Sequence, residues 1–304
     1  MKQHYLIVIF LSFFFACKKD PSFPQAKYIK KDSIISVSPP KPCNGFSELC
    51  NKKYDEVVYV TTHNAFNAKY GGSVNYTFPN QNYRVAKQLG DGVRGLMIDV
   101  YENSGQLVVY HGFSFTGSEP FANILNEIKL FLDTNPREVI TIILECYVTS
   151  SQIETAMNNA GLAQYLYSHS PNSQWETLEK IISSGKRLII FSDKDDAGNL
   201  SWYHYLWDYC VETGFSAHSK NELDCNYNRG DSANSLFILN HFITQSLIGT
   251  GLPDEANVIN SNPFLIDKAK ECMHLHGKPP NFLTVDFYNA GNVFDAAKEL
   301  NGVK

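Results

Sequence analysis

Continuous apolar runs alternate with amphipathic stretches along most of this 304-residue chain, and the alternation limits the folds that it can adopt. Runs that are apolar at nearly every position, rather than at every second one, are typical of strands buried on both faces of a sheet. Helices between such strands are the connections that parallel pairing requires. The pattern therefore predicts an α/β fold with a parallel sheet covered by helices.

The number of apolar runs favours a TIM-type (β/α) barrel, regular or distorted, over a doubly wound sheet. Residues 200–229 are rich in Trp, Tyr and Cys and poorly periodic, so the pattern does not define the number of strands there. We find no internal repeat and no sign of a second domain. The strands are expected within 57–64, 92–100, 106–111, 139–144, 187–192, 236–241 and 282–287, and the helices within 82–90, 121–132, 175–184, 263–276 and 293–300.

The N-terminus has the pattern of an export signal. A short basic start precedes an apolar stretch, 5–15, that is too short to cross a bilayer comfortably. Ala16-Cys17 then resembles a bacterial lipobox, in which Cys17 becomes the lipid-modified first residue of the mature protein; simple secretion is the alternative. We expect a lipoprotein signal peptide (1–16), a lipidated cysteine with a proline-containing flexible tether (17–42) and a barrel domain (43–304) in an exported cell-envelope lipoprotein held on the membrane.

Export changes how the seven cysteines are interpreted, because disulfides form in oxidising compartments. Cys17 is assigned to the lipid. Cys43 and Cys50 close a small loop just before the first predicted strand and are the disulfide that we predict. The other four allow three connectivities if all are bridged, and Cys146 is alternatively a buried free thiol. No C-x-x-C cluster indicates structural zinc.

The charge of the chain excludes one class of partner. The net charge is −5 and the pI is near 6.0, without a long run of one sign. Nothing polybasic therefore favours binding to nucleic acid. We expect a monomer without a nucleic-acid partner.

Polar residues recur where the apolar runs end. In a parallel barrel these ends share one mouth, where catalytic groups collect. Two histidines can act as base and acid near neutral pH, and carboxylates with an asparagine oxygen are hard ligands suited to calcium or magnesium. That chemistry fits displacement at a phosphodiester, although each residue singly is also compatible with a solvated loop. The residues are His63, Asn64, Asp99, His111, Glu145, Asp193 or Lys194, His241 and Asp286.

An ordered set of motifs resembles the X region of phosphatidylinositol-specific phospholipases C. They are Thr62-His63-Asn64, the segment Gly92-Val93-Arg94-Gly95-Leu96-Met97-Ile98-Asp99, and Val109-Tyr110-His111-Gly112. The similarity continues through 135–145, 187–191 and 239–242, and covers roughly residues 43 to 300. It is nearest to a branch of PLC-like phosphodiesterases with secreted and lipid-anchored members. A TIM-type barrel is what the resemblance implies.

The resemblance also implies a two-step mechanism. His63 would be the general base that takes the proton from the inositol 2-hydroxyl, which attacks its own phosphate. His111 would be the general acid that protonates the diacylglycerol leaving oxygen, and water would then open the cyclic product. Asp286, at the end of the last predicted strand, is our candidate for the carboxylate that orients His63; a helix-capping acid is the alternative.

Two solutions for the phosphate charge exist in that family. Metal-independent bacterial enzymes place an arginine where the second strand ends, whereas calcium-dependent relatives place acids there. This chain has Asp99 at that strand end, Met97 in place of an acid two residues earlier, and Asn64 and Glu145 at positions of calcium ligands. We therefore predict a divalent cation, calcium, on Asn64, Asp99 and Glu145. The alternative is a positive charge from Lys194 or Arg94, and Arg94 lies inside a strand pattern and is left out of the site.

Two further residues are predicted to bind substrate. Lys194 is a phosphate contact, and His241 contacts the inositol ring unless it is a histidine satisfied within the protein. The aromatic residues of 202–209 are either ordinary packing or a lip that enters lipid. We expect a phosphodiesterase acting on phosphatidylinositol or a related phosphodiester lipid. The alternatives are another glycerophosphodiester or a glycosylphosphatidylinositol as substrate, or an inactive barrel that binds envelope lipids or glycans.

Overall fold

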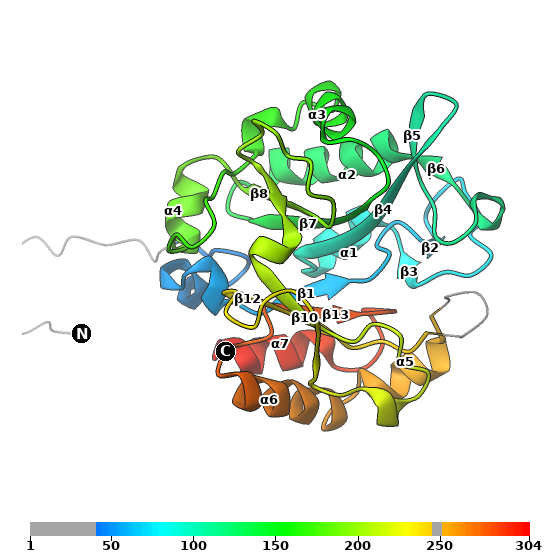
Figure 1. The fold of residues 1–304 in the computed structure, drawn as a ribbon. Coiled ribbons are helices and arrows are strands. Elements are labelled where there is room, and N and C mark those ends of the chain that lie inside the picture. The colour runs from blue at the N-terminus through cyan, green and yellow to red at the C-terminus, as the bar shows by residue number, and fades with distance from the viewer. Residues whose placement is uncertain (1–40, 245–250) are drawn as a thin grey trace, which may run out of the picture. The chain divides into compact units, whose positions relative to one another are not determined.

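An 11-stranded sheet forms the centre of the computed structural model, which describes residues 41–244 and 251–304 (Figure 1). A hairpin strand, β5 (Gln106–Val109), pairs with β4 (Gly95–Asn103) and with β6 (Glu119–Pro120). Separately, β2 (Ala68–Tyr70) pairs with β3 (Gln81–Tyr83). The main path runs in the order β11 (Tyr227–Arg229), β10 (Cys210–Thr213), β12 (Leu236–Asn240), β13 (Phe282–Val285), β1 (Tyr59–Thr62), β4 (Gly95–Asn103), β7 (Ile140–Cys146), β8 (Leu188–Ser192) and β9 (Tyr203–Tyr205).

Neighbouring strands from β10 to β9 along this path are parallel, and only β11 joins its end antiparallel. Within the described residues the path stops at β9 and does not pair back to β10, so the TIM-type barrel is irregular. Helices lie on either side of the curved sheet in Figure 1. They are α1 (Val85–Asp91), α2 (Phe121–Thr134), α3 (Ser150–Asn159), α4 (Leu178–Ser183), α5 (Pro253–Ile259), α6 (Phe264–His276) and α7 (Val293–Asn301).

Alternate side chains of each strand enter two different cores. Tyr59 of β1 and Ile143 of β7 pack with one cluster, and Val60 and Ile142 with the other. Because successive side chains point to opposite faces of a strand, the fully apolar runs fill both the barrel interior and the layer under the helices. Gly95 permits close packing between β1 and β4, since a Cβ at this position would lie 2.2 Å from Oγ1 of Thr61.

Two sequence expectations are corrected by the sheet. The run ending at His111 was expected to be a parallel barrel strand, but β5 runs antiparallel to β4 in a hairpin. The poorly periodic stretch 200–229 contains three short strands, β9, β10 and β11. Tyr203 and Tyr209 within it are buried. Their aromatic rings therefore serve mainly as packing.

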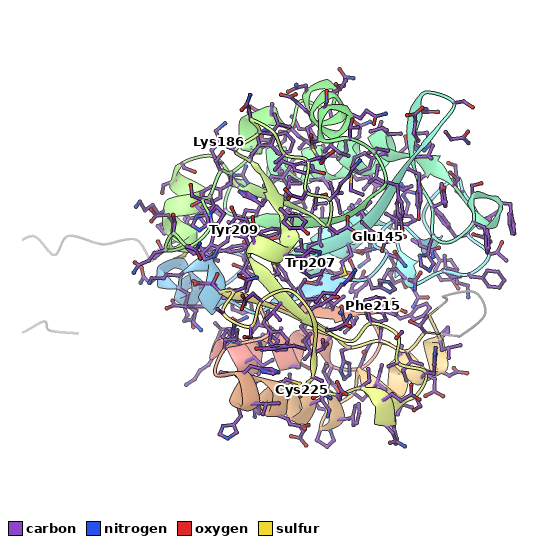
Figure 2. The ribbon with its side chains drawn as sticks, in the orientation of Figure 1. Glu145, Lys186, Trp207, Tyr209, Phe215 and Cys225 are labelled. Atoms are coloured by element: carbon purple, nitrogen blue, oxygen red, sulfur yellow. A yellow bond between two sulfur atoms is a disulfide. The ribbon has the colours of Figure 1, made fainter. Side chains whose placement is uncertain are left out.

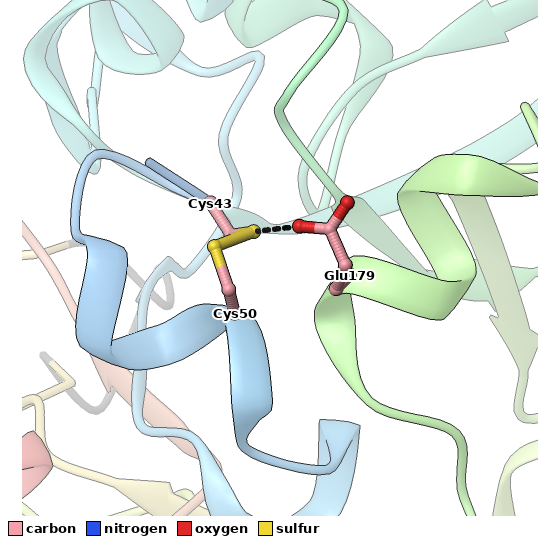
Figure 3. Close-up of side chains that lie close together, drawn as sticks. All are labelled: Cys43, Cys50 and Glu179. Atoms are coloured by element: carbon pink, nitrogen blue, oxygen red, sulfur yellow. Dashed lines mark hydrogen bonds between the residues drawn. A yellow bond between two sulfur atoms is a disulfide. The ribbon is translucent and has the colours of Figure 1, made fainter. Parts of the chain in front are cut away.

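The predicted disulfide between Cys43 and Cys50 is present, and a second joins Cys225 to Cys272. Figure 3 shows the first beside Glu179, whose Oε2 lies 3.4 Å from the Cys43 sulfur. Because both sulfurs are oxidised, this group offers no thiolate to a metal. Cys146 is buried and forms no disulfide, which agrees with the alternative that it is a free thiol. Cys210 is also buried and forms no disulfide.

The predicted signal peptide and the lipidated Cys17 lie outside the described residues, so the boundaries at 16 and 42 remain predictions. Within the residues that the structure describes, no helix is both long enough and apolar enough to cross a membrane.

Candidate active site

His63 follows the last residue of β1 and is held between two strands. Its backbone nitrogen donates to the carbonyl of Val285 at 3.1 Å, and its Nδ1 lies 2.9 Å from Oδ1 of Asp286, the residue after β13. Because a carboxylate only accepts hydrogen bonds, the proton sits on Nδ1 and the lone pair on Nε2. Adjacent parallel strands thus place an imidazole and its orienting acid side by side, as predicted from the strand ends.

A network of amides holds this pair. Asn80 donates from Nδ2 to both carboxylate oxygens of Asp286, at 3.2 and 3.1 Å, and Asn260 donates to the Asp286 carbonyl at 2.9 Å. Asn64 donates from Nδ2 to Nε2 of His63 at 3.1 Å. The His63 ring also stacks on Phe242, with centroids 4.0 Å apart. Hydrogen bonds and stacking therefore leave the ring little rotational freedom.

His111 reaches the same place through the β4–β5 hairpin. Its Nδ1 lies 3.1 Å from Oδ2 of Asp99, and its ring centroid lies 6.1 Å from that of His63. Burial raises the pKa of Asp99 to about 6, against the hydrogen bond from His111, which lowers it; the charge of Glu145 raises it further. The site therefore contains two imidazole–carboxylate pairs facing each other.

A cavity of about 270 Å³ lies beside these pairs, and its lining includes one residue of each, His63 and Asp99. The lining also includes a group of residues from the β9–β11 region: Trp207, Glu212, Phe215 and Arg229. Figure 2 shows Glu145, Trp207 and Phe215 together near the centre of the molecule. A cavity of this volume, with both charged and apolar residues in its lining, can hold a small polyol headgroup.

Arg229 is the cavity residue with a permanent positive charge, and sequence reasoning missed it. Its Nε donates to the buried Glu212, and its guanidinium lies over the rings of Trp207 and Phe215, at 4.6 and 4.5 Å from their centroids. Nε is used by Glu212 and the rings lie over the guanidinium, so its terminal NH2 groups can bind an anion or hydroxyls. The only signal in the sequence was an arginine among aromatic residues in a stretch without periodicity.

The predicted metal ligands are only partly brought together. Asp99 and Glu145 are register partners on β4 and β7, and both line the cavity. Asn64 is buried beside His63 and does not line the cavity, and its Nδ2 also bonds Asn80 at 3.3 Å. Two carboxylates at one edge of a polar cavity suit a hard cation whose remaining ligands are water and substrate oxygens. The donor set therefore fits calcium or magnesium through Asp99 and Glu145, with Asn64 as a ligand only after its amide turns.

Lys194 and His241 do not lie where substrate contacts were expected. Nζ of Lys194 donates to the Val148 carbonyl at 2.7 Å and lies 3.6 Å from Asp196. His241 is fully buried, and its Nε2 donates to the Ile259 carbonyl at 2.9 Å. Neither lines the cavity, because each side chain is bound to backbone behind it. The alternative for His241, a histidine satisfied within the protein, matches this placement.

Arg94 is also accounted for by the structure. It forms an ion pair with Glu138 at 2.8 Å and donates to the carbonyls of Leu89 and Val93. These bonds lie at the start of β4, at the opposite end of the strand from Asp99. Arg94 is therefore a structural residue, and it lies outside the cavity lining, as its exclusion from the predicted site requires.

The fold is an irregular parallel barrel, and two histidines with their carboxylates lie at its mouth. The family model described as PI-PLC X matches residues 49–301. The chain therefore belongs to the PI-PLC X family.

Curated relatives align with most of this chain. A PI-PLC X domain-containing protein of Arabidopsis thaliana is 32% identical over 276 residues, covering 82% of this chain and 62% of the relative. PI-PLC X domain-containing protein 1 of Arthroderma benhamiae is 27% identical over 280 residues, covering 86% and 90%. An uncharacterized secreted protein of that fungus is 27% identical over 290 residues, covering 86% and 64%. The chain thus spans less than two thirds of two of these relatives.

Solved structures share the fold. The phosphatidylinositol-specific phospholipase C of Listeria monocytogenes matches with a TM-score of 0.56 and 16% identity over 83% of this chain and 94% of that one. A mutant of the enzyme from Staphylococcus aureus matches with a TM-score of 0.58 and 14% identity, covering 85% and 95%. At such identities the likeness establishes the barrel and no more.

Proposed function

We propose that this protein is a phosphodiesterase of the phosphatidylinositol phospholipase C type, which cleaves the bond between phosphate and glycerol. The observation that carries the proposal is the pair of histidines, His63 and His111. Their ring centroids lie 6.1 Å apart, and each ring bonds a carboxylate. That separation leaves room for one phosphodiester between a base and an acid. Membership of the PI-PLC X family agrees with this chemistry.

His63 is the base in this proposal. Asp286 fixes the tautomer with its lone pair on Nε2, and the carboxylate stabilises the imidazolium that forms when Nε2 takes a proton. The substrate hydroxyl would replace the Asn64 amide as donor to Nε2. In the first step the inositol 2-hydroxyl loses its proton to His63, and its oxygen attacks phosphorus to form the cyclic diester.

His111 is the acid. Its Nδ1 donates to Asp99, so its other nitrogen can give a proton to the glycerol oxygen as the P–O bond breaks. The negative charge of Asp99 favours the protonated imidazole. When water later opens the cyclic diester, the two histidines exchange their roles.

A divalent cation, calcium, is proposed as the cofactor. Asp99 and Glu145 would hold it at the cavity wall, with Asn64 as a further oxygen ligand after rotation of its amide. Such an ion offsets phosphate charge in the transition state. It would also offset the repulsion between the substrate phosphate and the carboxylates of Asp99 and Glu145, because Arg229 is the one arginine or lysine in the described cavity lining.

The proposed location is the cell envelope. Cys17 would carry a lipid after removal of residues 1–16, and the tether would hold the barrel near a membrane that contains its substrate. We propose a monomer, with phosphatidylinositol or a related phosphodiester lipid as the ligand.

Product analysis tests the proposal. Purified full-length protein is incubated with phosphatidylinositol, with a glycosylphosphatidylinositol and with a glycerophosphodiester panel, with calcium or with a chelator. We expect inositol phosphates and diacylglycerol from phosphatidylinositol, and loss of turnover in His63→Ala. Hydrolysis of another member of the panel alone would reassign the substrate, and silence on every substrate would favour the inactive, lipid-binding or glycan-binding barrel.

A further inference from the structure

Two uncharged residues, Asn80 and Gln81, are buried beside the pair that His63 forms with Asp286. They lie where β3 begins, outside the main sheet, and both are fully buried. Neither is in the described lining of the cavity. Buried amides are normally satisfied by hydrogen bonds, and the side-chain bonds of these two residues lead to the segments that carry the proposed base and its acid.

The Asn80 amide fixes the carboxylate of Asp286. Its Nδ2 lies 3.2 and 3.1 Å from Oδ1 and Oδ2 of Asp286. Its Oδ1 accepts from Nδ2 of Asn67 at 2.7 Å and from Nδ2 of Asn64 at 3.3 Å. Because a carboxylate only accepts hydrogen bonds, the NH2 group of Asn80 must face Asp286. The bonds to both oxygens set the orientation in which Oδ1 of Asp286 meets Nδ1 of His63.

Gln81 holds the backbone from which the two side chains project. Its Nε2 donates to the carbonyl of His63 at 2.8 Å and to that of Val285 at 3.1 Å. Its Oε1 accepts from the backbone nitrogen of Tyr288 at 3.2 Å. Because Val285 and Tyr288 lie on either side of Asp286 in the chain, this one amide joins the end of β1 to both flanks of the carboxylate.

The backbone is strained directly after each member of the pair. The residues that follow them, Asn64 and Phe287, have φ angles of 46° and 47°. Side chains rarely adopt this left-handed conformation, and bulky ones least of all. The Phe287 nitrogen donates to the Asn80 carbonyl at 2.8 Å. Since strained residues persist only where their surroundings over-determine them, the turn after Asp286 depends on the segment that carries Asn80.

We propose that Asn80 is a positioning residue for the proposed base: its amide orients the Asp286 carboxylate, which in turn keeps the proton of the neutral His63 ring on Nδ1. Gln81 supports it by fixing the backbone of both strand ends. This deepens the proposed function and rests on it, because the tautomer matters for turnover only if His63 accepts a proton at Nε2.

The tautomer of His63 tests the proposal without catalysis. In Asn80→Asp a carboxylate still accepts from the neighbouring amides but faces Asp286 with a like charge. The ring nitrogen chemical shifts of full-length protein report which nitrogen of the neutral imidazole carries the proton, and His63→Ala identifies the signal. We expect Nδ1 in wild type and a mixture of both tautomers in Asn80→Asp. Asn82→Asp, the same change at a β3 side chain that bonds Asn289, should keep the wild-type tautomer.

Kinetics on a water-soluble inositol phosphodiester supply the second arm. Asn80→Asp should lower kcat by about tenfold or more and leave KM nearly unchanged, because Asn80 lies outside the cavity lining. Asn82→Asp should match wild type in both. Asn80→Ala/Asp286→Asn should be no slower than Asp286→Asn alone, since Asn80 acts through that carboxylate.

Several results would overturn the proposal: a wild-type proton on Nε2, a wild-type tautomer and kcat in Asn80→Asp, or a further tenfold loss in the double variant. If Asn80→Asp does not fold, Asn80→Ala takes its place in both arms, and unfolding of both would make Asn80 a structural residue instead. If wild type turns over no substrate while the tautomer shifts as expected, the proposed function fails and the positioning of His63 stands.

Discussion

Oδ1 of Asp286 lies 2.9 Å from Nδ1 of His63, although the two residues are 223 positions apart in the chain. The contact exists because β13 and β1 are parallel neighbours, with Val285 opposite Thr62. It fixes the imidazole tautomer whose lone pair is on Nε2.

Replacement of Asp286 tests this relationship. Asp286→Asn keeps the shape but presents an amide to Nδ1, which favours the wrong tautomer and removes the stabilisation of the imidazolium. We expect kcat to fall by about 10³-fold with little change in KM. Asp295→Asn, which changes an exposed acid on α7, is the control and should leave kcat and KM at their wild-type values. A loss below tenfold would show that His63 does not depend on this carboxylate.

Arg229 is expected to bind the headgroup. Arg229→Lys preserves the charge but loses the planar edge beyond the pair with Glu212, so KM should rise about tenfold with kcat nearly unchanged. Initial-rate kinetics on a soluble inositol phosphodiester measure this. Arg137→Lys, whose partner Glu179 lies outside the cavity lining, is the matched control. An unchanged KM would place the headgroup elsewhere.

The proposed cation gives a separate prediction. A chelator should abolish turnover and calcium should restore it, and Glu145→Gln should raise the calcium concentration needed for half-maximal activity about tenfold, because one anionic ligand is lost. Glu255→Gln, on α5, should behave as wild type. Full activity in excess chelator would exclude a divalent cation and leave Arg229 to meet the phosphate charge.

His204 should make folding stability depend on pH. It accepts from the His169 nitrogen at Nε2 and donates from Nδ1 to the Ile190 carbonyl, so it is satisfied as a neutral ring. Burial lowers its pKa from 6.5 to about 4. The unfolded chain therefore binds this proton more readily, and stability that is complete above pH 6.5 is lost as the pH falls towards 4, by about 3 kcal/mol in total.

Urea unfolding of wild type and His204→Gln between pH 7 and pH 4.5 measures this. The difference between the two proteins isolates His204 from carboxylates that titrate in the same range. The variant should lose less stability than wild type on acidification. If both proteins lost the same free energy of unfolding on acidification, His204 would not stay neutral in the folded protein.

The two disulfides should differ in their contribution to stability. Cys225 and Cys272 are 47 positions apart, and Cys43 and Cys50 only 7. In the chain-entropy account the longer loop contributes about 4 kcal/mol and the shorter about 2 kcal/mol. Denaturant unfolding of Cys225→Ala/Cys272→Ala and Cys43→Ala/Cys50→Ala should reproduce this order, and the reverse order would point to native-state contacts instead.

Much of the site could be predicted because strand ends are visible in the sequence. His63, Asp99, Glu145 and Asp286 each lie at or just past the end of a long apolar run, and parallel strands deliver their carboxyl ends to one mouth. Arg229 could not be found in this way. It stands on a three-residue strand, where side-chain periodicity has too few positions to be read.

The errors have a similar cause. Lys194 and His241 follow apolar runs just as the site residues do, but position along a strand does not determine whether a side chain turns into the cavity or back into the protein. Backbone carbonyls of Val148 and Ile259 bind these two side chains. His111 lies beside Asp99 because of a hairpin, and not at the end of a parallel strand as expected.

The sequence alone determined the class of fold, the strand ends that supply the two histidines and their acids, and membership of a family. Local patterns carry that information because burial on both faces of a strand and the period of a helix are written in neighbouring residues. Only the tertiary structure decided which side chains meet: the pairing of His63 with Asp286, the cage around Arg229, and the amide of Asn80 on the Asp286 carboxylate. Those contacts depend on distances between segments far apart in the chain, which no local pattern encodes.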